Sequence, residues 1–176
     1  MPNKNNWLSF TITNDNRDTI NNINMMIKDT ITDLDIIDHN LIHMTCVFFG
    51  KLLQGKTKKV LTQANNVIIE YIEKLKEMDI TLFFERYDYL PFNKKPKKLL
   101  VAIYKDDKKL KSWNLNLRKQ LNKLGICGYI TDDFMPHITI GKIKNVHNTS
   151  NFEKYPNINI NDLYLDGIKN KYILNR

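Results

Sequence analysis

Two of the four histidines open the same short pattern, in which a threonine stands two positions after the histidine. His43 and Thr45 form the first copy, and His137 and Thr139 form the second copy, 94 residues later. An imidazole titrates near neutral pH and can act as a general acid or a general base, while a threonine hydroxyl can donate a hydrogen bond. Two such pairs therefore predict chemistry in which one group takes up a proton and another gives one up.

Each pattern lies in a run of β-branched and aromatic residues that predicts a buried strand; the runs are 41–50 and 137–143. Side chains alternate across a strand, so each histidine should share a face with its threonine. The same alternation predicts that Phe48 points to the face opposite His43. It also places Lys142 on the face opposite His137, so Lys142 is not assigned to the predicted site.

These two polar faces suit a phosphate held between two imidazoles. One histidine would remove a proton from a nucleophilic oxygen, and the other would protonate the leaving oxygen. Thr45 and Thr139 would donate hydrogen bonds to the non-bridging oxygens, where charge develops. Neither a metal ion nor another cofactor is required, and the residues do not indicate which histidine is the base. The alternative is that both histidines are hydrogen-bonded members of the core.

Hydrophobic periodicity predicts the elements that position these residues. A first helix, capped by Asp15 or Asn16, carries an apolar stripe from Ile20 to Leu34. A second helix runs from a Thr57 cap to Met78, and a third runs from about Asp106 to Gly125. Strands are expected at 7–13, 41–50, 80–86, 99–104, 137–143 and, as a final edge strand, 163–168. The predicted order is strand, helix, strand, helix, strand, strand, helix, strand, strand.

Composition limits the class of protein. The chain has 176 residues, enough for one domain, and a formal net charge of +8. Residues 1–88 hold 10 Lys+Arg and 12 Asp+Glu, so the positive charge lies in the second half. This charge would favour the binding of a polyanion, or it would simply keep the surface hydrated. Cys46 and Cys127 fit no disulfide or zinc pattern and are expected to be buried thiols. With no membrane-span or signal pattern, we expect a soluble cytoplasmic protein.

The two histidine patterns resemble those of the 2H phosphoesterase superfamily (LigT-like), whose signature is two H-x-T motifs about a hundred residues apart. The resemblance includes Phe48 and Gly50 after the first motif and Phe134 and Pro136 before the second. The opening NWLSFTIT and the KLGI that ends the third helix look most like one branch of the superfamily. That branch contains the central domain of A-kinase anchoring proteins and the 2′,5′-phosphodiesterases of some coronaviruses and rotaviruses. The similarity extends from Trp7 to about Ile168.

The resemblance implies one domain, residues 1–176, with a bilobal α+β fold in which two pseudo-symmetric lobes, each with an antiparallel sheet and flanking helices, surround a central cleft. It identifies His43 and His137 as catalytic and Thr45 and Thr139 as phosphate-binding. Phe10, Tyr104 and Tyr129 are candidates for stacking against a base, although each could equally belong to the core.

The branch resemblance favours a small nucleotide or oligonucleotide with a 2′-5′ linkage, such as 2′-5′ oligoadenylate or 2′,3′-linked cyclic GMP-AMP. If the gene is viral, the enzyme would remove an innate-immune second messenger in the host cytoplasm. Two alternatives stay open: a phosphodiesterase acting on the 2′,3′-cyclic phosphate ends of RNA, and a non-catalytic RNA- or nucleotide-binding module. A monomer without a membrane partner is expected.

Overall fold

The computed structural model describes residues 6–91, 98–128, 130–131, 133–160 and 163–166, the last of these by their backbone. Its elements, in chain order, are β1 (Asn6–Phe10), α1 (Asn14–Thr30), β2 (Asp35–Ile36), the short 3-10 helix η1 (His39–Leu41), β3 (Met44–Gly50), α2 (Lys58–Met78), β4 (Ile80–Leu82), β5 (Phe84–Leu90), β6 (Lys98–Tyr104), α3 (Lys108–Lys123), β7 (His137–Ile143), β8 (Ile158–Ile160) and β9 (Leu163–Asp166). The order agrees with the sequence pattern, with β2 and β8 as additional short strands.

The first helix begins two or three residues earlier than its sequence suggests. Its N-cap is Thr13, whose Oγ1 accepts a hydrogen bond from Asn16 N at 3.3 Å, and not Asp15 or Asn16. The helix ends at Thr30, so Ile31 and Leu34 lie beyond it. Both are nevertheless buried, because the chain that follows the helix turns back over the same core.

The other two helices agree closely with prediction. The Thr57 hydroxyl caps α2 by accepting a hydrogen bond from Val60 N at 3.3 Å, as expected. Asp107 caps α3 through Leu110 N at 2.8 Å, one residue after the expected start. Gly125 follows α3 with φ +67°, a conformation that glycine adopts without steric cost.

Every described strand pairs antiparallel with a neighbour, and the strands form two separate sheets. The large sheet has the order β5-β6-β7-β3-β1-β9, with β2 paired to β7, and β4 pairs with β8 in a separate ribbon. The expected strand at 80–86 is therefore two strands that belong to different sheets. Within the described residues, β3 and β7 pair only at Met44 and Ile138, so this one position joins the two halves of the large sheet.

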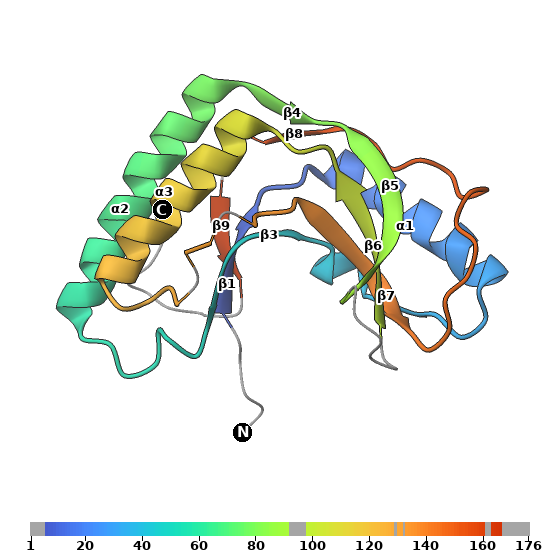
Figure 1. Ribbon diagram of the computed structural model, residues 1–176, viewed down its shortest axis with the longest axis horizontal. Coiled ribbons are helices and arrows are strands. Elements are labelled where there is room, and N and C mark those ends of the chain that lie inside the picture. The colour runs from blue at the N-terminus through green and yellow to red at the C-terminus, as the bar shows by residue number, and fades with distance from the viewer. Residues whose placement is uncertain (1–5, 92–97, 129, 132, 161–162, 167–176) are drawn as a thin grey trace.

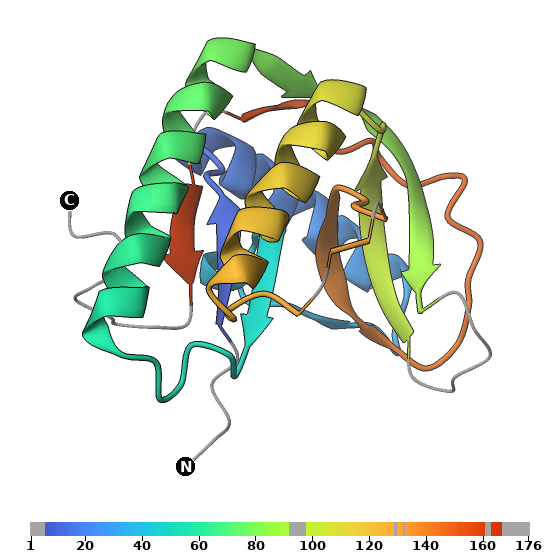
Figure 2. The same ribbon diagram turned by 60° about the vertical axis from the view of Figure 1, so that its left-hand side comes forward.

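The helices cover the two halves of the sheet separately (Figure 1). Helices α2 and α3 lie side by side against the half formed by β3, β1 and β9, and α1 lies behind the half formed by β5, β6 and β7 (Figure 2). This architecture confirms the expected α+β fold class. Cys46 and Cys127 are both buried thiols, as predicted. No helix among the described residues is both long and apolar enough to cross a bilayer.

Candidate active site

The pairing of β3 with β7 brings the two histidine patterns together. Met44 pairs with Ile138, and both side chains are fully buried on one face of the sheet. In an antiparallel pair the flanking residues oppose each other, so His43 lies across from Thr139 and Thr45 lies across from His137. All four side chains face away from the Met44 side. His43 and His137 are therefore diagonal neighbours. In a regular ladder, diagonal neighbours lie about 7–8 Å apart, a spacing that suits one phosphate between two imidazoles.

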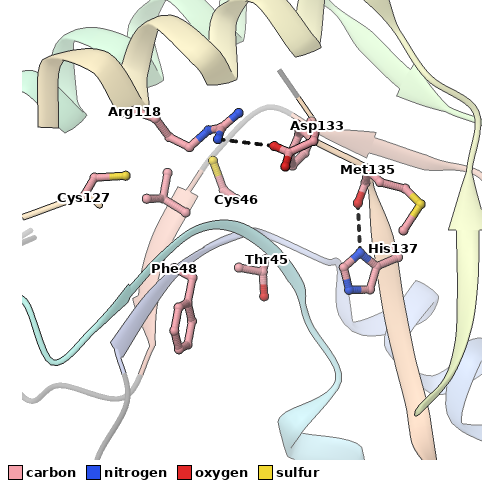
Figure 3. Close-up of a pocket in the computed structure, with 10 residues that line it drawn as sticks. Thr45, Cys46, Phe48, Arg118, Cys127, Asp133, Met135 and His137 are labelled. Atoms are coloured by element: carbon pink, nitrogen blue, oxygen red, sulfur yellow. Dashed lines mark hydrogen bonds and ion pairs between the residues drawn. The ribbon is translucent and has the colours of Figure 1, made fainter. Parts of the chain in front are cut away.

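Both histidines are oriented by the same local hydrogen bond. His43 Nδ1 lies 2.7 Å from the carbonyl oxygen of Leu41, and His137 Nδ1 lies 2.8 Å from that of Met135. A carbonyl can only accept, so Nδ1 carries the proton in each ring. Nε2 is therefore the atom left for a ligand, and in His137 it lies on the side of Thr45 (Figure 3). Two imidazoles held in this tautomer can each exchange a proton through Nε2.

The two histidines differ in their surroundings. Burial lowers the pKa of His137 and the nearby His43 lowers it further, while the hydrogen bond to Met135 opposes both effects. His43 instead stacks against Trp7 of β1, with ring centroids 5.1 Å apart and planes inclined by 24°. The Trp7 Nε1 atom is buried and has no hydrogen-bond partner among the described residues. The stacked indole restricts the orientation of the His43 ring.

A bulge in β3 brings Phe48 to the face of Thr45 and the two histidines. On β1, Ser9 pairs with Thr45 and Leu8 pairs with Val47, so Cys46 is an extra residue that shifts the alternation. Phe48 therefore shares a face with Thr45, and its side chain is 55% exposed. The sequence-based prediction that Phe48 points to the opposite face is wrong, because strict alternation does not allow for a bulge.

A second bulge has the same effect on Lys142. On β6, Val101 pairs with Thr139 and Leu100 pairs with Gly141, which leaves Ile140 as the extra residue. Lys142 consequently returns to the face of Thr139 and is exposed there. The expectation that this lysine faces away from the site is therefore also wrong.

A pocket of about 230 Å³ adjoins the two motifs. It extends from Thr45 and His137 toward α3 (Figure 3). The pocket combines apolar side chains with one buried arginine and one carboxylate, and its lining is Thr45, Cys46, Val47, Phe48, Arg118, Cys127, Asp133, Phe134, Met135 and His137. A space of this composition next to the two motifs suits a planar, partly polar group.

Two of the aromatic residues chosen from the sequence, Phe10 and Tyr104, do not line this pocket. Phe10 is 1% exposed and packs against Trp113 and Phe134. Tyr104 is also 1% exposed, and its hydroxyl donates to the carbonyl of Pro156. Neither ring can present a face to a ligand, so these two predictions are wrong, and Tyr129 lies outside the described residues. The exposure of Phe48 follows from the bulge, which no local signal in the sequence reveals.

Among the described residues, side chains that could hold a metal ion do not gather in this site. Across the part of the chain that the structure describes, no three or more His, Cys, Asp or Glu residues form a candidate metal-binding group. The polar groups that converge on the motifs are imidazoles, hydroxyls and cationic side chains, with the carboxylate of Asp133 in the adjoining pocket. These groups suit an anion with exchangeable protons.

Solved structures share this fold. The chain aligns over 92% of its length with a crystal structure of a phosphoesterase (TM-score 0.59, 14% identity, 86% of that chain). It aligns equally far with E. coli LigT complexed with 3′-AMP (TM-score 0.58, 15% identity, 86% of that chain) and with TT0787 of Thermus thermophilus (TM-score 0.57, 12% identity, 83% of that chain). The protein therefore has the fold of the LigT-like 2H phosphoesterases. No protein-family model and no curated protein sequence matches the chain.

Proposed function

We propose that this protein is a metal-independent phosphodiesterase that cleaves 2′-5′-linked nucleotides through His43 and His137. One observation supports this most strongly: the Met44–Ile138 pair places each histidine across from the threonine of the other motif, on one face of the sheet. The fold shared with LigT and a phosphoesterase is consistent with it.

The proposed reaction needs a neighbouring ribose hydroxyl. In a 2′-5′ bond the free 3′-hydroxyl attacks phosphorus, and its proton passes to the base. The lowered pKa of His137 favours the neutral imidazole, so His137 acts as the base and His43 as the acid. The bond to the 5′-oxygen then breaks, His43 protonates that oxygen, and the products are a 2′,3′-cyclic phosphate and a released 5′-hydroxyl.

The side chains around the histidines have supporting roles. Thr45 and Thr139 donate hydrogen bonds to the non-bridging oxygens as their charge increases. Phe48, half-exposed beside Thr45, provides a face on which a base can stack, in place of the buried Phe10 and Tyr104. Its place in the pocket next to the phosphate site is the reason for this assignment.

The preferred substrates are 2′-5′ oligoadenylate and 2′,3′-linked cyclic GMP-AMP. This choice rests on the resemblance of the two motifs and their flanks to the branch with viral 2′,5′-phosphodiesterases, and a viral role in removing immune second messengers would follow from it. The linkage matters because a 3′-5′ bond would move the leaving oxygen away from its acid, and a displacement of about 1 Å can reduce the rate on the order of a hundredfold. DNA lacks the neighbouring hydroxyl and should not react.

The test compares initial rates on matched 2′-5′ and 3′-5′ ApA, with a 2′,3′-cyclic mononucleotide alongside, all in excess EDTA. We expect faster cleavage of 2′-5′ ApA and unchanged activity after chelation. Equal rates on the two dinucleotides would refute the linkage preference, and activity confined to the cyclic mononucleotide would indicate RNA-end processing. Activity that disappears in EDTA and returns with a divalent ion would refute the metal-independent mechanism.

Variants identify the catalytic groups in the same assay. His43→Ala and His137→Ala should each reduce turnover by roughly a hundredfold or more, the scale of a lost acid or base. His147→Ala is the matched control, because its imidazole binds Asp33 at 2.9 Å, away from both motifs. Nucleotide binding without turnover by the wild-type protein would support the non-catalytic binding module instead.

A further inference from the structure

The orientation of each catalytic histidine depends on the backbone segment just before it. His43 donates to the carbonyl of Leu41, and His137 donates to the carbonyl of Met135, so a shift of either carbonyl would turn the ring. Neither carbonyl belongs to one of the motif strands, since β3 begins at Met44 and β7 begins at His137. The carbonyl of Pro136, between Met135 and His137, accepts a hydrogen bond from Tyr104 N of β6 at 3.0 Å, and helix side chains add further contacts to both segments.

An arginine from α1 fixes the first segment. Arg17 Nη1 donates to the carbonyl of Ile42 at 2.7 Å and lies 3.4 and 3.5 Å from the carbonyls of Asn40 and His39. These carbonyls lie on both sides of Leu41, at the end of η1, where the His39 carbonyl also accepts from Ile42 N at 3.3 Å. A guanidinium that binds them restrains the peptide that orients His43.

An arginine from α3 fixes the second segment. Arg118 is 2% exposed; its Nη2 donates to the carbonyl of Thr131 at 2.8 Å, and its Nη1 lies 3.8 Å from Asp133 Oδ1. Its Nε donates to Asn114 Oδ1 at 2.8 Å, and Asn114 Nδ2 donates to the carbonyl of Cys46 at 2.8 Å. One buried guanidinium thus connects the approach to His137 with the bulge beside Thr45.

The two halves of the protein use the same arrangement. In each, the helix that precedes the motif strand carries an arginine: Arg17 binds carbonyls on both sides of Leu41, and Arg118 binds Thr131 and Asp133, four and two residues before Met135. A charge-assisted, planar donor fork is suited to holding several acceptors in fixed positions. Burying a guanidinium is costly unless it is paired, and the buried Arg118 meets this condition through Asn114, Thr131 and Asp133.

We propose that Arg17 and Arg118 are a matched pair of positioning residues, in which Arg17 sets the ring of His43 and Arg118 sets the ring of His137. This inference rests on the proposed function for its effect on catalysis. Its structural content, the dependence of each imidazole on one arginine, can be measured without any substrate.

The first readout is the tautomer of each histidine, from two-bond proton–nitrogen NMR spectra of the full-length protein at alkaline pH, where imidazoles are neutral. The wild type should show Nδ1–H in both rings. Arg17→Ala should give mixed tautomers for His43 alone, and Arg118→Lys, which retains the charge but loses the fork, should do so for His137 alone. Lys28→Ala is the matched control, since Lys28 binds the carbonyls of Thr32 and Leu34 from the same helix as Arg17, away from both motifs.

The second readout is turnover. Arg17→Ala and Arg118→Lys should each lower kcat on the order of tenfold to a hundredfold with a smaller change in KM, because they displace a reacting group. Millimolar guanidinium ion should restore both readouts in Arg17→Ala, and Lys28→Ala should behave as wild type. Should Arg118→Lys fail to fold, Arg17→Ala with its rescue decides the proposal by itself.

Two outcomes would overturn the proposal: Arg17→Ala with the wild-type tautomer and wild-type kcat, or Lys28→Ala with an equal loss. A protein without phosphodiesterase activity, but with the expected tautomer changes, would refute the proposed function and leave the positioning roles intact.

Discussion

Replacing Phe48 with alanine tests how the protein holds a base. The side chain is 55% exposed and lines the pocket next to Thr45 and His137, so its ring has a free face beside the proposed phosphate position. Stacking of a base on an aromatic ring contributes about 1–3 kcal/mol. Because tenfold in affinity corresponds to about 1.4 kcal/mol, KM for 2′-5′ ApA should rise roughly fivefold to 150-fold in Phe48→Ala.

The same substitution should affect stability and turnover little. Less than half of the ring is buried, so its removal should cost about 1 kcal/mol of the free energy of unfolding. Stacking is present in both the ground state and the transition state, which predicts an unchanged kcat. Phe48→Trp, which retains an aromatic face, should keep KM near the wild-type value.

Phe83→Ala is the matched control for this assay. Phe83 is 52% exposed, a value close to that of Phe48, but it lies between β4 and β5 and is not among the residues that line the pocket. Steady-state kinetics with 2′-5′ ApA and urea unfolding of all three variants provide the comparison. The reasoning would be refuted if KM of Phe48→Ala stayed within about twofold of wild type, or if Phe83→Ala raised KM equally.

Two further predictions concern the pKa of His137 and the pairing of Met44 with Ile138, the joint between the motif strands. Burial and the nearby His43 lower the pKa of His137, so the acidic limb of kcat/KM should lie below pH 6.5, the ordinary value of histidine, and a limb above it would exclude His137 as the base. By linkage, His137 contributes to the free energy of unfolding above the pKa it has in the unfolded chain, and this contribution should be lost as pH falls through its lower folded-state pKa. His137→Gln should remove this dependence of the free energy on pH, as measured by urea unfolding at a series of acid pH values. Ile138→Ala should cost about 2–5 kcal/mol because the side chain is fully buried, and it should also lower kcat because this residue joins β3 to β7. Ile72→Ala, at an equally buried position on α2, should lose comparable stability in urea unfolding but keep kcat, and equal losses of kcat would contradict the importance of the joint.

Local sequence signals were sufficient for most of the elements. The apolar stripes and the Thr57 cap predicted α2 to its end, and the run from His137 to Ile143 coincides with β7. These features depend on residues three or four apart in a helix, or two apart in a strand, so they can be read from the chain itself. The errors at the start of α1 and in the strand at 80–86 have a different origin: several residues could cap α1, and pairing partners decided where β4 ended and β5 began.

The sequence by itself determined that two histidine–threonine pairs exist and that each pair shares one face of a strand. Only the tertiary structure decided that the pairs meet at Met44 and Ile138, because that contact joins strands 94 residues apart. It also decided the faces of Phe48 and Lys142, since a bulge forms in response to the neighbouring strand and reverses the alternation beyond it. The carbonyls that orient the two imidazoles, and the arginines that hold those segments, depend likewise on how α1 and α3 pack. The residue types supply the chemistry, and long-range pairing and helix packing place it, because these contacts join residues that no local pattern relates.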